Sequence, residues 1–172
     1  MKKRYSLLLL IVVIGLLVSA CSNKTNNNTD SDTAGKQPTY ESSLSAKEMT
    51  DKLLAQVEQP QLMDIDAASV KDQFHLDASL LADYSIKMPL MNVKSNEIAI
   101  LKINDIKDIP AVETALKQRA ADVQKQFETY LPDQYENAQN FKIIVKGVYV
   151  LYVISESADQ LAAAFDELFA QS

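Results

Sequence analysis

Hydrophobic positions between residues 45 and 172 follow two periods, one typical of helices and one typical of strands. Ser45–Val57 places its apolar side chains on one helical face, and the pattern stops before Pro60. Tyr84–Leu90 alternates apolar and polar residues, which predicts a half-buried strand that is at a sheet edge or ends at its proline. Glu97–Ile103 is almost continuously apolar and predicts a more buried strand.

The same order of elements returns further along the chain. An apolar stripe from Val112 to Phe127 predicts a long helix that begins near Asp108. Two strands are predicted over Phe141–Val145 and Val148–Ile154, joined by a tight turn at Lys146-Gly147. A final helix follows, and both it and the first helix begin with the spacing of a capping box, Ser157–Gln160 and Ser45–Glu48.

These elements predict an α+β domain. The order after residue 80 is strand, strand, helix, strand, strand, helix. We expect an antiparallel sheet of about four strands in a ββαββα arrangement, with the helices on one face and an N-terminal helix before it. The two ββα halves have similar patterns at their second strand and helix, so an internal duplication is a hypothesis that the pattern leaves open.

The first twenty residues are typical of an export signal. Lys2, Lys3 and Arg4 precede an apolar run over 7–18, which is shorter than a membrane-spanning helix requires and ends in small residues. Val18-Ser19-Ala20-Cys21 resembles the lipobox of bacterial lipoproteins. This resemblance implies that signal cleavage precedes Cys21 and that its thiol receives a diacylglycerol with acyl chains such as palmitate. Two acyl chains would give stable membrane anchoring.

Three segments are therefore predicted: a lipoprotein signal peptide (1–20), a lipidated cysteine with a disordered polar tether (21–44), and a single domain (45–172). Residues 1–20 hold three of the 17 basic residues and none of the 23 acidic ones, which leaves a net charge of −9 for residues 21–172. Such a domain is not expected to bind nucleic acid. We expect it at the cell membrane, lipid-anchored on the extracytoplasmic face, with an unknown protein or small-molecule partner at the cell surface.

Two short motifs extend the resemblance beyond the N-terminus. They are Tyr130-Leu131-Pro132-Asp133-Gln134-Tyr135 and Val145-Lys146-Gly147-Val148-Tyr149-Val150, supported by Met88-Pro89-Leu90 and Glu97-Ile98-Ala99. With them, the segment from Tyr84 to Phe169 is similar to an uncharacterised family of extracytoplasmic lipoproteins of Gram-positive bacteria, known as a domain of unknown function. The resemblance implies a cell-surface lipoprotein and supplies no activity.

Residues with catalytic chemistry are scarce. His75 is the only histidine and the chain has three glycines, so no zinc site, phosphate loop or other cofactor site is predicted. The candidate binding residues are Tyr130, Asp133 and Tyr135 in a predicted loop, together with Tyr149. The alternative reading is that both loop rings cover the core at the end of the preceding helix.

We therefore favour a non-enzymatic interaction or binding domain. One alternative is a lipoprotein that binds a small ligand in a cleft near Tyr135 and Tyr149. Another is a hydrolytic enzyme whose site is not visible in the sequence. A deep pocket lined by polar side chains would favour the first alternative, and an exposed apolar patch without a pocket would favour the interaction domain.

Overall fold

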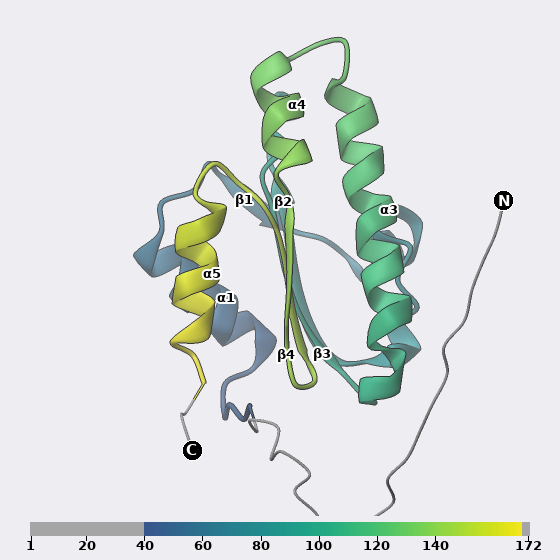
Figure 1. The fold of residues 1–172 in the computed structure, drawn as a ribbon, viewed down its shortest axis with the longest axis vertical. Helices are drawn as coiled ribbons and strands as arrows, with labels where there is room; N and C mark the ends of the chain where they lie inside the picture. The colour runs from purple at the N-terminus through teal and green to yellow at the C-terminus, as the bar shows by residue number, and fades with distance from the viewer. Residues whose placement is uncertain (1–39, 170–172) are drawn as a thin grey trace, which may run out of the picture. The chain divides into compact units, whose positions relative to one another are not determined.

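The structure, a computed structural model, describes residues 40–169. Within this range the chain forms an α+β domain, as predicted, with five antiparallel strands in the order β1-β2-β3-β5-β4 (Figure 1). The strands are β1 (Leu62–Asp64), β2 (Leu81–Pro89), β3 (Glu97–Ile103), β4 (Lys142–Lys146) and β5 (Tyr149–Ile154). The helices are α1 (Ala46–Gln56), α2 (Ala67–Phe74), α3 (Ile109–Phe127), α4 (Pro132–Gln139) and α5 (Ala158–Asp166). Cys21, the signal and most of the polar tether lie outside the described residues.

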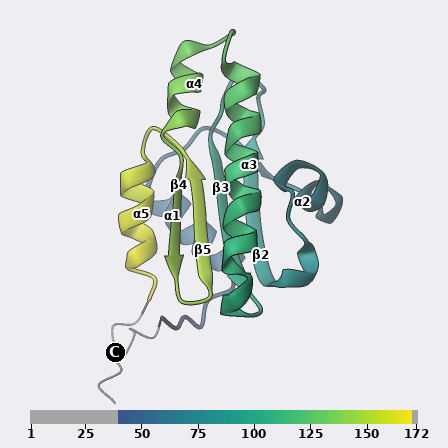
Figure 2. The ribbon, with the colours of Figure 1, turned by 45° about the vertical axis from the view of Figure 1, so that its right-hand side comes forward.

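Helices cover both faces of the sheet, so the prediction of helices on one face was wrong. Figures 1 and 2 show α3 on one side and α1 with α5 on the other. Phe74 of α2 and Leu101 of β3 belong to the core on the α3 side, whereas Phe165 of α5 and Ile100 of β3 belong to the core on the opposite side. The physical reason lies in β3. Its successive side chains point to opposite faces of the sheet, and both faces of this strand are apolar, so its residues enter two cores. A strand without a polar face needs cover on both sides.

The described sheet has one strand more than predicted. β1 has three residues and no recognisable period, yet it pairs with the end of β2 so that Leu62 lies opposite Pro89. Pro89 ends β2, as the sequence predicts, and the strand itself is not at the edge of the sheet. Leu90 lies beyond the strand and is 57% exposed, so it is not part of the buried face predicted for it.

The helix ends confirm one of the two predicted capping boxes. The Ser45 hydroxyl accepts a hydrogen bond from the Glu48 backbone N–H while the Glu48 carboxylate accepts one from the Ser45 N–H, which confirms the first capping box. The predicted second box is absent, because Ser157 has φ −104° and ψ 26° and its side chain makes no capping bond. Pro132 does not lead into a loop: it occupies the first turn of α4, where proline is well tolerated.

The two ββα halves have opposite handedness. β3 and β5 are antiparallel neighbours, with β2 and β4 outside them. A rotation that places β3 on β5 must also reverse the strand direction, so its axis is perpendicular to the sheet. Such a rotation moves a helix along the sheet but leaves it on the same face. α3 and α5 cover opposite faces, so no rotation superimposes the halves. The similar sequence patterns therefore do not correspond to a rigid structural repeat.

The fold begins before residue 45. The Tyr40 ring packs edge-on against Phe169 with centroids 5.7 Å apart, and Leu44 packs against the core formed by α1 and α5. Residues 40–169 belong to one compact unit, and every helix and strand described above lies inside it. A fragment from residue 36 onward therefore contains all contacts of the fold described here and is expected to fold by itself.

Candidate functional site

Buried polar side chains concentrate at the end of the sheet where β3 begins and β5 ends, called here the polar end. Of ten buried polar or charged residues in the described part of the chain, seven lie there: Ser95, Asn96, Glu97, Arg119, Gln134, Asn137 and Ser155. A buried polar group destabilises a fold unless it is hydrogen-bonded, so this concentration requires an explanation. Hydrogen bonds among these side chains and with neighbouring residues provide part of that explanation.

The polar end faces away from the point where the described chain begins. The Tyr149 hydroxyl donates to the Ser42 carbonyl oxygen at 3.2 Å, which places residues 40–42 at the start of β5. Glu97 pairs with Ile154 at the other end of that strand. Five steps along a strand separate these points by roughly 17 Å. Figure 1 shows the same relation, with α4 at the end opposite the first described residues.

One network joins the loop before β3 to α4. The Gln134 side-chain oxygen accepts from the Ser95 backbone N–H at 2.9 Å and from its hydroxyl at 3.1 Å. The Asn137 amide donates to the same hydroxyl at 3.0 Å. These bonds hold the first turns of α4 against residue 95, so α4 has a fixed position relative to the sheet.

A second network crosses to the loop that precedes α5. The Asn96 amide donates to Gln59 at 3.3 Å and to the Glu156 carboxylate at 2.8 Å, while the Ser155 hydroxyl donates to Gln59 at 2.9 Å. The Asn96 Oδ1 atom is buried and has no hydrogen-bond partner among residues 40–169. A buried acceptor without a donor costs about 1–3 kcal/mol, so this position is not optimised for stability alone.

The innermost part of the polar end is an ion pair between Glu97 and Arg119. Glu97 is 2% exposed and accepts two hydrogen bonds from the guanidinium, at Nε and Nη2, while the Arg119 group lies over the Phe74 ring at 5.0 Å. Burial raises the pKa of Glu97, although Arg119 opposes this effect. Burial disfavours the charged form of Arg119 too, but Glu97 outweighs it and the pKa of Arg119 is raised. The Tyr152 hydroxyl, 3.5 Å from Glu97, has a pKa well above its usual value because it is buried.

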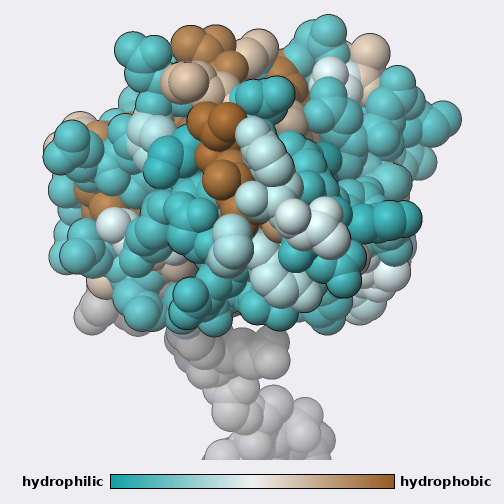
Figure 3. Space-filling model, turned by 90° about the horizontal axis from the view of Figure 1, so that it is seen from above, coloured by the Kyte–Doolittle hydropathy of each residue, from teal (hydrophilic) through white to brown (hydrophobic). Residues whose placement is uncertain are grey.

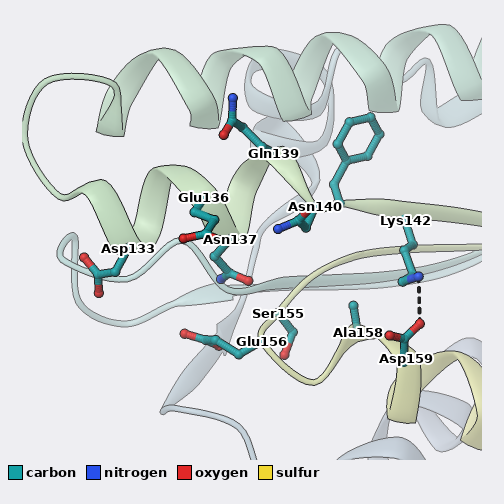
Figure 4. A pocket seen from close by; sticks show the side chains of 11 residues that line it. Asp133, Glu136, Asn137, Gln139, Asn140, Lys142, Ser155, Glu156, Ala158 and Asp159 are labelled. Atoms are coloured by element: carbon teal, nitrogen blue, oxygen red, sulfur yellow. Dashed lines mark ion pairs between the residues drawn. The ribbon is translucent and has the colours of Figure 1, made fainter.

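A surface groove of about 720 Å³ opens at the polar end between α4 and the start of α5, called here the polar groove. Figure 4 shows side chains from α4, from residues 139–142 and from residues 155–159 around it. Four carboxylates line the groove, from Asp133, Glu136, Glu156 and Asp159, and the lining cation is Lys142, which is 2.8 Å from Asp159. The groove is therefore negative, and its neutral polar groups are amides and a hydroxyl.

The structure separates the four binding residues predicted from the sequence. Tyr130 is 65% exposed in the turn between α3 and α4, and Asp133 lines the polar groove. Tyr135 is partly buried against the core on the α3 side. Tyr149 is 3% exposed and belongs to the core on the opposite face, at the opposite end of β5. The prediction of a cleft near Tyr135 and Tyr149 is therefore wrong, because the sheet lies between the two rings.

Sequence reasoning missed most residues of the polar end. The available signal was Arg119, which interrupts the apolar stripe of α3 three residues after Leu116 and one before Ala120, and is 9% exposed. A charged residue on an apolar helix face predicts a buried partner. The sequence does not say that the partner is Glu97, because that contact joins residues 22 positions apart.

Residues 40–169 contain neither a metal-binding cluster of side chains nor a membrane-spanning helix. No group of three or more His, Cys, Asp or Glu side chains in this range could hold a metal ion. His75 ends α2 and its Nε2 lies 2.6 Å from an Asp122 carboxylate oxygen on α3. None of the helices in the same range is long and apolar enough to span a membrane.

Most of the described domain matches a known protein family. A family described as a domain of unknown function (DUF4358) matches residues 55–155. The chain belongs to this family. No curated protein and no solved structure matches the chain. The DUF4358 segment includes the whole sheet, α2 to α4, and both members of the Glu97–Arg119 pair. It ends just before Glu156, so one wall of the polar groove lies outside it.

Proposed function

We propose that this DUF4358 protein is a lipid-anchored extracytoplasmic binding domain that presents the polar groove away from the membrane. The observation that supports it most directly is the groove of about 720 Å³ at the end of the sheet opposite residues 40–42. Cys21, behind an apolar N-terminal segment, would be the anchor. An anchor on the N-terminal side of Tyr40 would leave the polar end free to meet a partner.

The charge of the groove indicates what kind of partner would bind. Three of its four carboxylates have no ion-pair partner within residues 40–169, and the side-chain amide of Gln134 lowers the pKa of one of them, Asp133. Carboxylates accept hydrogen bonds, and amides both accept and donate them. Together with the net negative charge, these groups favour ligands with amino and hydroxyl groups. We infer a surface polymer or protein partner that presents such groups.

Fixed walls favour binding over a purely structural role. The Ser95–Gln134 and Asn96–Glu156 hydrogen bonds hold the two sides of the groove to one loop. Side chains fixed before binding lose less conformational entropy when a ligand arrives. The networks thus stabilise a preformed groove rather than a closed core.

Site-specific photo-crosslinking in cells would test the groove. A photoreactive residue at Gln139, which is exposed and lines the groove, should capture a partner, whereas one at Lys117 on the exposed side of α3 should not. Replacing Glu136 and Glu156 by glutamine should abolish the product, and Glu41→Gln at the other end of the domain should leave it unchanged. Identical products from positions 139 and 117 would refute the proposal.

The anchor is tested separately. Cells fed an alkyne fatty acid should label the wild-type chain and not Cys21→Ala, and the labelled protein should fractionate with membranes. An unlabelled wild-type chain would exclude the lipid anchor without affecting the groove.

A further inference from the structure

A second, smaller cavity lies next to the buried ion pair. It has a volume of about 200 Å³ and is formed by the end of β2, the loop before β3, and α3; we call it the Arg119 pocket. It shares no lining residue with the polar groove, so the inference below does not depend on the proposed function. All of its lining residues fall within the segment that matches the family.

The floor of the Arg119 pocket is a rigid, buried cation. Glu97 occupies Nε and Nη2 of the Arg119 guanidinium, and the Phe74 ring lies against it. The remaining nitrogen, Nη1, has no hydrogen-bond acceptor in the described part of the chain. Nη1 is not among the buried side-chain atoms that lack a partner, so it is open to solvent and can donate to an acceptor oxygen of a ligand.

The charge of the pocket is positive once this pair is taken into account. Glu97 and Arg119 neutralise each other, and the remaining charged lining residue is Lys94. Lys94 forms no ion pair within residues 40–169, although it is close enough to Asp133 to contribute to the lowered pKa of that carboxyl. An anionic oxygen in the pocket would therefore meet an unpaired ammonium group and a free guanidinium N–H.

Apolar side chains from β2, from the residue after it and from α3 also line the pocket. Met88, Leu90 and Phe127 line the pocket, and Leu90 is 57% exposed at its edge. The next residue, Met91, is 62% exposed, and Figure 3, which looks onto this end of the domain, shows apolar surface surrounded by hydrophilic surface. Exposed large apolar side chains beside a cavity mark a surface that gains free energy when it is covered.

From these observations we propose that the Arg119 pocket binds a carboxylate attached to a short apolar group. Its carboxylate would accept hydrogen bonds from Lys94 and Arg119, and its apolar group would cover Phe127 and Leu90. The volume equals that of about seven water molecules, which suits a ligand of roughly seven to nine non-hydrogen atoms, such as one leucine residue with its carboxylate. Such a group occurs at a peptide C-terminus and in a free apolar acid.

Amide NMR titration of a fragment comprising residues 36–172 tests this proposal. N-acetyl-leucine should shift the amide signals of Leu90, Lys94 and Phe127 with a dissociation constant in the millimolar range or below. N-acetyl-leucine amide, which lacks the carboxylate, and N-acetylglycine, which lacks the apolar group, should each bind at least fivefold more weakly. Lys94→Gln should weaken binding about fivefold, whereas the matched change Lys125→Gln on the exposed side of α3 should not.

Several results would overturn the proposal. They are the absence of shifts at the pocket residues up to about 10 mM ligand, equal binding of the acid and its amide, and equal effects of the Lys94 and Lys125 variants. A peptide ending in leucine distinguishes the two sources. Tighter binding of the peptide than of N-acetyl-leucine supports a peptide C-terminus, and weaker binding supports a free acid. Repeating the titration with the full chain in lipid nanodiscs checks that the pocket is open in the complete protein.

Discussion

Replacing Arg119 by methionine should be among the most destabilising changes that a single residue can make in this fold. Methionine retains much of the aliphatic volume but leaves the Glu97 carboxylate, which is 2% exposed, without its partner. Removing one member of a buried pair costs about 3–5 kcal/mol, and losing the cation–π contact with Phe74 adds about 1 kcal/mol. A domain of ordinary stability, about 5–15 kcal/mol, would lose a large part of its free energy of unfolding.

The pH dependence makes this prediction specific. Without Arg119, burial raises the pKa of Glu97 further than in the wild-type protein, because only the long hydrogen bond from Tyr152 still opposes it. A carboxyl group with a raised folded-state pKa favours the folded state below its unfolded pKa, near 4.3, and this contribution is lost as the pH rises through the folded-state value. The deficit of Arg119→Met should therefore be largest at neutral pH and shrink towards pH 4.

Urea unfolding of residues 36–172, followed by circular dichroism between pH 4 and 8, measures this deficit. The double variant Glu97→Leu/Arg119→Met serves as the control, because replacing both partners by apolar groups is often neutral or stabilising. A deficit below about 1 kcal/mol, or one that does not change with pH, would refute the assignment of a buried charged pair.

Three further changes test other parts of the structure. Gly147→Ala should lower the free energy of unfolding by about 1–2 kcal/mol, because this position has φ +57°; an unchanged urea midpoint would contradict the turn geometry. Ser45→Ala should remove the N-cap of α1 at a cost of about 1 kcal/mol in the same assay, and Ser43→Ala, just outside the helix, should have little effect. The hydrogen bond with His75 lowers the pKa of Asp122, so this carboxylate stabilises the fold above its unfolded pKa and the gain is lost as the pH falls through the folded value; Asp122→Asn should flatten the acid limb of stability against pH.

Periodicity was sufficient where an element buries a continuous face. The predicted buried strand Glu97–Ile103 has the bounds of β3, and the predicted stripe from Val112 to Phe127 is the buried face of α3. Both elements are long and have many apolar residues in register. In such elements the burial of side chains decides the conformation, and the sequence displays that burial directly.

Contacts between distant segments were not predictable in the same way. The side of the sheet that α5 covers depends on how the chain crosses over after β5, and the local pattern is the same for either face. β1 exists only because β2 offers a free edge to Leu62–Asp64. The polar end combines loops, a helix and strand ends, and a single buried Asn or Ser has no periodic signal. Hence fold class was accessible from the sequence, and site assembly was not.

The distribution of buried polar groups bears on whether the polar end evolved for stability. A buried ion pair is on average no more stabilising than apolar residues of the same volume, and Asn96 Oδ1 remains without a donor within residues 40–169. The opposite end of the sheet uses aromatic contacts instead, with Tyr149 and Phe165 packed against Phe169. A sequence optimised only for stability would have no reason to treat the two ends differently. Fixed hydrogen-bonding side chains beside two cavities are what the proposed binding function requires, and binding at the polar end is therefore the explanation that we propose for the asymmetry.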